Sequence, residues 1–254
     1  MLKVEHISCG YGREPVVKDV SFHVKEGERL CILGPNGCGK TTLLKAVLGI
    51  LPASGSVMID NDALWDMPTR ERAKRIALMS QMSFAYFSYT VYETVMLGRY
   101  AHQKQSMFFR ADTVDVRMVE ESLARTGMLE HKDKPITELS GGQMQRVFLA
   151  RIFAQDPQVI LLDEPTNHLD LKYQVELMKN LKDWAGEGKR CVVGVLHDIN
   201  LALSFADMVL LMEEGTVTSF EKVENFDLSL LSHAFQMDVR GYMEDSLTRW
   251  QSKI

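Results

Sequence analysis

The stretch that decides the fold is Gly34-Pro35-Asn36-Gly37-Cys38-Gly39-Lys40-Thr41. It matches the phosphate-loop pattern G-x-x-x-x-G-K-[ST] in full, between a short apolar run at 30–33 and a helical pattern at 41–48. Glycines let backbone N–H groups approach phosphate oxygens, and the start of the next helix adds the positive end of its dipole. Lys40 should reach the β- and γ-phosphates, and the Thr41 hydroxyl should ligate Mg²⁺. The residues expected to contact nucleotide here are Gly34, Asn36, Gly37, Cys38, Gly39, Lys40, Thr41 and Thr42.

A second motif lies at the end of a continuously apolar run, 159–162, which is followed by Asp163 and Glu164. Such runs are typical of strands in parallel sheets that are covered on both faces. Because ligands bind such sheets at the carboxyl ends of the strands, Asp163 is expected to hold Mg²⁺ and Glu164 to polarise the attacking water. Without the phosphate loop upstream, the same pattern would indicate only a strand followed by solvated acids.

The remaining elements predict an α/β chain with a helical insertion. Strand patterns occupy 2–8 and 16–24, and strands again alternate with helices after residue 158. Between them, 112–127 is amphipathic and 141–155 is apolar on nearly all sides, which predicts two helices. We expect one domain over 1–254, in which 1–83 and 158–220 form the α/β core, 84–157 the helical part and 221–254 a C-terminal extension.

Composition disfavours several other classes of protein. The 254 residues are 46% hydrophobic and 25% charged, as in ordinary globular proteins, and the net charge of −5 gives no reason to expect a nucleic-acid partner. The four cysteines show no C-x-x-C spacing, which argues against a disulfide scaffold or zinc site and suits a reducing cytosol. The mixed polar start, 1–6, does not resemble a signal peptide. The longest uncharged run, 76–92, is too polar to span a bilayer, so membrane work would require a partner.

A third motif, Leu139-Ser140-Gly141-Gly142-Gln143, resembles the signature sequence of ABC-type ATPases. Ser140 is a good helix N-cap, and the two glycines leave the first N–H groups of the helix open to an anion. In that superfamily the anion is the γ-phosphate of ATP held by the other subunit. The resemblance covers about residues 2–220. It implies a P-loop ABC-type nucleotide-binding domain of the α/β class, with an antiparallel β subdomain, a helical subdomain insertion, and ATP and Mg²⁺ as cofactors.

The same resemblance implies roles for four further residues. Tyr11 is similar to the aromatic residue that stacks on adenine, although a tyrosine of the turn is the alternative. Gln81 resembles the glutamine that touches Mg²⁺ and the attacking water. Asp170 resembles the loop aspartate that couples the two sites, and His197 the switch histidine at the γ-phosphate. The implied catalytic residues are therefore Lys40, Gln81, Glu164 and His197. The implied metal contacts are Thr41, Gln81 and Asp163. Outside the phosphate loop, the implied nucleotide contacts are Tyr11, Ser140, Gly141, Gly142, Gln143 and Asp170.

Aromatic residues gather after Gln81, at a density typical of interfaces. The segment 84–109 holds Phe84, Tyr86, Phe87, Tyr89, Tyr92, Tyr100, Phe108 and Phe109. We expect Tyr92 and one of Phe108 and Phe109 to belong to the core of the insertion. In ABC importers a helix of the membrane subunit docks at this place, so the resemblance implies a polytopic permease partner that contacts residues of about 82–109.

Two further passages, within 90–100 and at 197–202, are similar to the subfamily that energises uptake of iron–siderophores, haem and corrinoids. This similarity implies a peripheral ATPase on the cytoplasmic face of the inner membrane. Its partners would be a second copy of itself, permease subunits and, indirectly, a substrate-binding protein. An importer ATPase for another metal or an oxyanion, an exporter subunit, and a soluble ABC-type ATPase without a membrane partner remain alternatives. The cargo stays open because the ATPase subunit does not touch it.

Overall fold

The computed structural model describes residues 1–80, 89–103, 112–167 and 169–251. Its larger sheet has six strands in the order β10-β9-β3-β8-β7-β6, with β10 antiparallel to β9 and the others parallel. The strands are β3 (Arg29–Leu33), β6 (Ile76–Met79), β7 (Val159–Asp163), β8 (Cys191–Val195), β9 (Met208–Glu213) and β10 (Thr216–Lys222). The central strands β7, β8 and β9 are buried along almost their whole length, which is why their sequences are continuously apolar.

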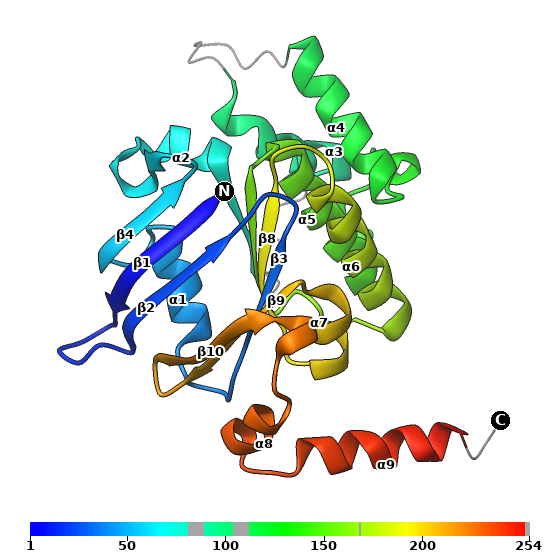
Figure 1. Cartoon of the computed structure of the whole chain (residues 1–254). Coiled ribbons are helices and arrows are strands. Elements are labelled where there is room, and N and C mark those ends of the chain that lie inside the picture. Colours follow the sequence, from blue (N-terminus) through cyan, green and yellow to red (C-terminus); the bar gives the residue numbers. More distant parts are fainter. Residues whose placement is uncertain (81–88, 104–111, 168, 252–254) are drawn as a thin grey trace.

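A second, antiparallel sheet has the order β2-β1-β4-β5. Its strands are β1 (Leu2–Cys9), β2 (Val17–Val24), β4 (Ala53–Ile59) and β5 (Asp62–Ala63). Helix α1 (Lys40–Val47) packs against both β1 and β7, so one hydrophobic core joins the two sheets (Figure 1). The sequence pattern did not indicate β4, whose first half carries Ser54, Gly55 and Ser56 in place of alternating apolar residues.

A second core covers the opposite face of the larger sheet. It is formed by α5 (Gly141–Gln155), α6 (Leu171–Ala185) and α7 (Ile199–Phe205) together with β6 to β9. Trp184 of α6 is only 1% exposed, and its ring stacks on Phe153 of α5 with 6.2 Å between centroids. This contact joins α5, which begins in the helical insertion, to the helix layer of the α/β core.

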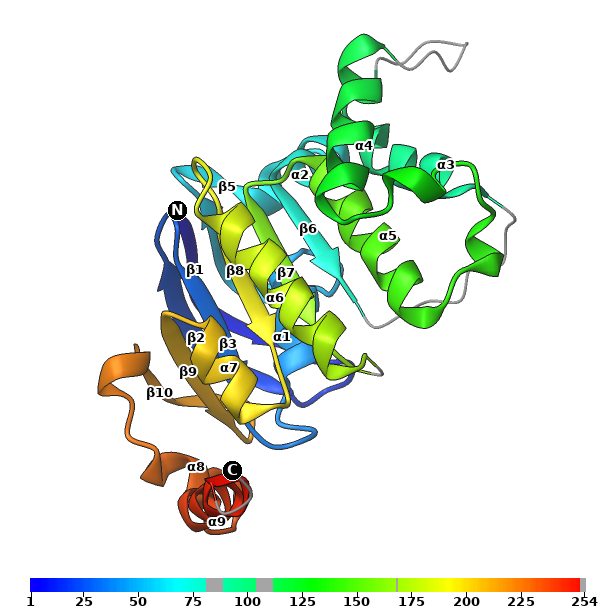
Figure 2. The same cartoon turned by 90° about the vertical axis from the view of Figure 1, so that its right-hand side faces the viewer.

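The helical insertion has a third core of its own, visible as a separate group of helices in Figure 2. Its elements are α3 (Val91–Met96), η2 (Leu97–Ala101), α4 (Thr113–Arg125), η3 (Leu129–His131), η4 (Ile136–Glu138) and α5. Tyr92 is half-buried against this core, as expected, whereas Phe108 and Phe109 lie outside the described residues. The insertion also contains a buried ion pair, in which Arg99 Nε lies 2.8 Å from Asp115 Oδ1 and both side chains are 6% exposed.

The rest of the chain consists of short elements and a C-terminal extension. The short elements are η1 (Leu64–Asp66), α2 (Thr69–Arg75) and η5 (Val223–Asn225). Two helices, α8 (Ser229–Phe235) and α9 (Val239–Gln251), follow β10 and form the last part of the chain. In the described residues no helix has both the length and the apolar character of a membrane span.

Candidate active site

The phosphate loop connects β3 to α1 and contains three glycines with positive φ. Gly34, Gly37 and Gly39 have φ of 146°, 82° and 107°, a region that favours glycine. A β-carbon at Gly34 would come within 2.1 Å of the Met212 carbonyl oxygen, so no other residue fits there. Gly39 is the N-cap of α1 and provides no side-chain cap, so the first N–H groups of the helix remain open to an anion.

A pocket of about 170 Å³ opens at this loop. Its lining residues are Val16, Asn36, Gly37, Gly39, Lys40, Thr41, Thr42 and Glu164. Lys40 is only 6% exposed, and its ammonium donates hydrogen bonds to the carbonyl oxygens of Gly34 at 2.7 Å and Pro35 at 2.8 Å. These bonds hold the positive charge inside the loop, where it favours a bound phosphate.

Cys38 belongs to the loop, but its side chain is buried and packs in the core beneath. Burial raises the pKa of this thiol, although the nearby Lys40 ammonium opposes the shift. Cys38 would therefore meet a nucleotide through its backbone N–H and not through sulfur.

Thr41 and Asp163 meet at the edge of the pocket, where the start of α1 faces the end of β7. The Thr41 hydroxyl donates a hydrogen bond of 2.7 Å to Asp163 Oδ1. Burial raises the pKa of the Asp163 carboxyl, the charge of Glu164 adds to the shift, and the Thr41 hydrogen bond opposes it. A hydroxyl beside a carboxylate is a set of hard oxygen donors, which fits Mg²⁺.

Glu164 is held at both carboxylate oxygens. Its Oε1 lies 2.6 Å from Nε2 of His197, and its Oε2 accepts a hydrogen bond of 2.7 Å from the Asn167 side-chain amide. Its backbone has φ of 54°, uncommon for a residue other than glycine, and its N–H donates to the Val195 carbonyl at the end of β8. The sequence indicated Glu164 and His197 but not Asn167, for which only its place three residues after Glu164 gave a hint.

The signature residues lie at the exposed start of α5. Ser140 caps the helix by accepting a hydrogen bond from Gln143 N–H, and the Gln143 side chain accepts one from Ser140 N–H in return. Gly141 has open space around it, whereas a β-carbon at Gly142 would come within 2.9 Å of the Tyr173 ring. Among the described residues that line the phosphate-loop pocket, none comes from 140–143.

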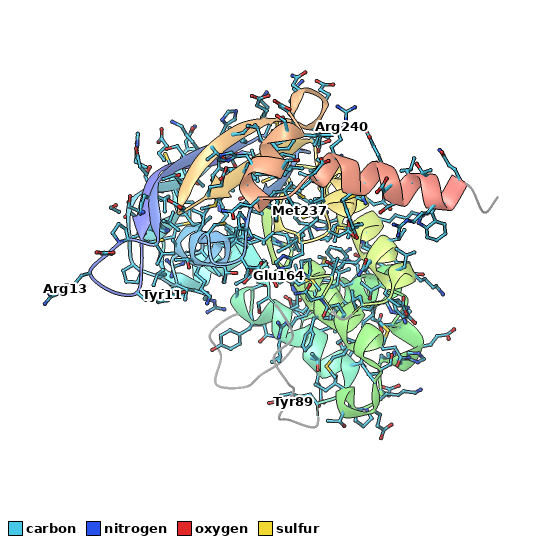
Figure 3. The ribbon with its side chains drawn as sticks, turned by 90° about the horizontal axis from the view of Figure 1, so that it is seen from below. Tyr11, Arg13, Tyr89, Glu164, Met237 and Arg240 are labelled. Atoms are coloured by element: carbon cyan, nitrogen blue, oxygen red, sulfur yellow. The ribbon has the colours of Figure 1, made fainter. Side chains whose placement is uncertain are left out.

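Three further predicted site residues lie apart from the pocket lining or outside the described residues. Tyr11 is 66% exposed and lies near α1, with Lys45 Nζ 6.0 Å from its ring centroid. Figure 3 shows it near Arg13 at one end of the view, with Glu164 near the centre. Asp170 caps α6 by accepting a hydrogen bond of 3.1 Å from Tyr173 N–H. Gln81 lies outside the described residues, as do 82–88 and 104–109 of the predicted permease contact after it.

Comparison with known proteins identifies the class to which this fold and site belong. The family model described as "ABC transporter" matches residues 17–167, more than half of the chain. The chain therefore belongs to the ABC transporter family, and it is an ATPase of that family.

Individual relatives agree with this assignment. The iron(3+)-hydroxamate import ATP-binding protein FhuC of Bacillus subtilis is 37% identical over 239 residues, covering 93% of this chain and 88% of FhuC. The ABC transporter ATP-binding protein YvrA of Bacillus subtilis is 42% identical over 224 residues, covering 88% of this chain. The matched part spans only 50% of YvrA, so the chain corresponds to about half of that relative.

Two solved structures share the architecture. A metal-chelate type ABC transporter in an inward-facing conformation matches with a TM-score of 0.80 and 29% identity, over 92% of this chain and 88% of that one. A dimeric ATP-binding cassette in a post-hydrolysis state with ADP and phosphate matches with a TM-score of 0.75 and 30% identity, over 89% of this chain and all of that one.

Proposed function

We propose that this chain is the ATP-hydrolysing subunit of a membrane importer, in which two copies close head to tail around ATP. The observation that carries the proposal is the division of the site within one chain. The described lining of the pocket with Lys40 and Glu164 includes no residue of 140–143, while Gly141 stands exposed at the start of α5. A second copy supplies these helix N–H groups to the phosphates bound by the first.

The residues around the pocket divide the work of hydrolysis. Lys40 and the N–H groups at the start of α1 stabilise charge on the transferring phosphoryl group. Glu164 orients a water for in-line attack on the γ-phosphorus and accepts its proton, as the bond to the leaving oxygen of ADP breaks. His197 and Asn167 fix the position of the Glu164 carboxylate. His197 also contacts the γ-phosphate of the bound ATP. Thr41 and Asp163, with Gln81, would hold Mg²⁺, which when bound neutralises phosphate charge.

Two contacts would complete nucleotide binding. The exposed ring of Tyr11 stacks on the adenine, a contact that guanine would also accept. Asp170 lies at the start of α6, next to Tyr173, whose ring faces Gly142. The loop aspartate and the signature glycines therefore approach the second copy together, and each site responds to the other.

The helical insertion is the proposed contact with the permease. In the described part of the aromatic segment, Tyr89 and Tyr100 are 42% and 66% exposed, while Val91 and Val95 of α3 are buried. Aromatic side chains on a rigid helical support are typical of interfaces. We place the chain on the cytoplasmic face of the membrane, with a substrate-binding protein acting through the permease.

The proposed cargo is a metal chelate of the iron–siderophore, haem or corrinoid type. Its support is the similarity to FhuC, named for iron(3+)-hydroxamate import, and to a metal-chelate type transporter structure. Other metals and oxyanions are the alternative cargoes.

Two experiments test these proposals. A pull-down in mild detergent from the native host, with this chain as bait, should recover a polytopic membrane protein in stoichiometric amount. Ribosomes, DNA-processing proteins or no partner would contradict the importer function and leave only the ATPase. The variant Glu164→Gln should bind ATP and dimerise but hydrolyse about 10²-fold or more slowly. Turnover at the wild-type rate would exclude Glu164 as the base.

A further inference from the structure

Two glutamine side chains hold the loop that carries Glu164, and they come from two different helices. The loop runs from the end of β7 to the start of α6. Gln145 of α5 donates a hydrogen bond of 2.7 Å from its side-chain amide to the carbonyl oxygen of Pro165. Gln174 of α6 donates one of 3.0 Å to the carbonyl oxygen of Leu169. The loop is therefore tied at its beginning to the signature helix and at its end to α6.

The bond made by Gln145 is the shorter and the more deeply buried of the two. Gln145 is only 5% exposed, and a hydrogen bond out of contact with water is strong and fixes the distance between the groups it joins. Gln145 lies two residues after Gln143, the last signature residue, and Pro165 directly follows Glu164. One side chain thus connects the signature helix to the residue next to the proposed base.

This connection reaches the base itself and not only its neighbour. Asn167 of the same loop donates a hydrogen bond of 2.7 Å to Glu164 Oε2, so a shift of the loop at Pro165 moves the carboxylate and its donor together. Tyr173, which packs on Gly142, also joins the signature helix to another element, but that element is α6.

A glutamine that only satisfies a buried carbonyl is the alternative, and the same helix provides an example. The Gln155 side-chain amide donates to the carbonyl oxygens of Ala73 at 2.6 Å and Ile76 at 3.2 Å. Ile76 is the first residue of β6, whereas ligands bind a parallel sheet at the carboxyl ends of its strands. Gln155 therefore makes the same kind of bond away from the nucleotide, and it is the matched control for Gln145.

We infer that Gln145 is a positioning residue, which makes the placement of Glu164 depend on what the signature helix of the same chain contacts. The inference rests on the proposed function, in which phosphates bound by one copy meet Gly141 and Gly142 of the other. In that other copy, Gln145 carries the contact from the start of α5 to Pro165 and so to the base of its own site. Binding of ATP at one site thereby places the base at the other.

Replacing each glutamine by methionine tests this role. Methionine keeps the length of the side chain but cannot donate to a carbonyl. Gln145→Met should lower kcat about tenfold or more, because a small misplacement of a reacting group has an effect of this size. Its affinity for ATP as a monomer should not change, since Gln145 is not among the described residues that line the phosphate-loop pocket.

The control Gln155→Met should keep the wild-type kcat, even where its Tm falls as far as that of Gln145→Met. Both variants are assayed below their Tm values. An unchanged kcat in Gln145→Met, a change confined to KM, or an equal loss of kcat in the two variants would overturn the inference.

Linked dimers determine which site Gln145 serves. Two full-length copies joined by a flexible linker rich in glycine and serine form a dimer of fixed composition. One copy carries Glu164→Gln, so only the other copy hydrolyses ATP. Adding Gln145→Met to the hydrolysing copy should lower the rate, whereas adding it to the Glu164→Gln copy should not. An equal loss in both arrangements, or a loss only in the second, would show that Gln145 does not act on the base of its own chain.

Failure of this inference can be told apart from failure of the proposed function. ATP-driven dimerisation of the Glu164→Gln chain, together with an unchanged kcat in Gln145→Met, would contradict the positioning role and leave the ATP-bound dimer intact. A Glu164→Gln chain that stays monomeric with ATP in sedimentation velocity would contradict the proposed function, and the inference with it.

Discussion

The ring of Tyr173 covers Gly142, so that a β-carbon at position 142 would come within 2.9 Å of two ring carbons. Tyr173 lies in the first turn of α6, which Asp170 caps, and the guanidinium of Arg146 lies 5.1 Å from the same ring. The start of the signature helix and the start of α6 are thus packed as one unit. Gly142 is required by this packing as well as by any approach of phosphate.

Replacing Gly142 should therefore reduce ATPase activity partly through Tyr173. An alanine there forces the ring or the signature helix to move, and overpacking of this kind costs about 1–3 kcal/mol. We expect Gly142→Ala to lower ATPase activity about tenfold or more. The double variant Gly142→Ala plus Tyr173→Ala should recover much of the loss relative to Tyr173→Ala alone. If the double variant is as inactive as Gly142→Ala, the glycine is needed for nucleotide contact alone.

Replacing the Asp163 carboxylate should raise the stability of the nucleotide-free chain and lower its ATPase activity. Burial raises the pKa of this carboxyl, so the folded state prefers the protonated form, and stability from this group is lost as pH rises through the folded pKa. Asp163→Asn should consequently raise the Tm of the nucleotide-free chain at pH 7, while lowering Mg²⁺-dependent ATPase activity about 10²-fold or more. The gain in Tm should shrink at acid pH, where the wild-type carboxyl is also neutral. A lower Tm for Asp163→Asn at pH 7 would refute this account.

Breaking the buried ion pair of the helical insertion should lower the free energy of unfolding strongly. Arg99 and Asp115 are 2.8 Å apart with side chains 6% exposed, and Arg99 also donates to the Ala154 carbonyl oxygen at 2.7 Å. Asp115→Ala leaves a buried guanidinium without its counter-charge, at a cost of about 3–5 kcal/mol in the free energy of unfolding.

The matched control is the exposed pair of Arg117 and Glu121 on the same helix, 3.7 Å apart. Glu121→Ala should change the free energy of unfolding by about 0.5 kcal/mol or less. Urea denaturation measures both, and similar effects from the two variants would show that burial of the pair does not matter.

Cys38 should react slowly with alkylating reagents despite its place in the phosphate loop. Its thiol is buried and its pKa is raised, so little thiolate exists near neutral pH. We expect iodoacetamide to modify Cys38 about tenfold or more slowly than an exposed cysteine at pH 7, faster at higher pH, and more slowly still with ATP bound. Peptide mass spectrometry follows each thiol separately. Cys191, whose pKa burial raises to about 12, is the internal control and should stay unmodified. Rapid modification of Cys38 at pH 7 would contradict the buried geometry.

Much of the fold was predictable where the evidence lies within a short stretch of chain. The pattern 30–48 predicted a strand, a glycine-rich loop and a helix, and the structure confirms β3 and α1 to within one residue at each boundary. The apolar run before Asp163 likewise became β7, and β8 is one of the strands expected to alternate with helices after residue 158. Neither β4 nor α2 was predicted, because serine and glycine interrupt the first, and the second is a short helix in which no residue is buried.

The sequence by itself determined the local chemistry of the site. Glycines permit the left-handed backbone of the phosphate loop, and the apolar run 159–162 is followed directly by the acids Asp163 and Glu164. These are properties of a few consecutive residues, so they do not depend on how distant elements pack together.

The tertiary structure alone decided which side chains meet. His197 meets Glu164, the Tyr173 ring covers Gly142, and the end of α8 lines a hollow together with His197. Each of these contacts depends on where separate elements are placed by the hydrophobic cores between them. Packing of that kind follows from the volume and shape of many side chains together, so no local pattern in the sequence encodes it.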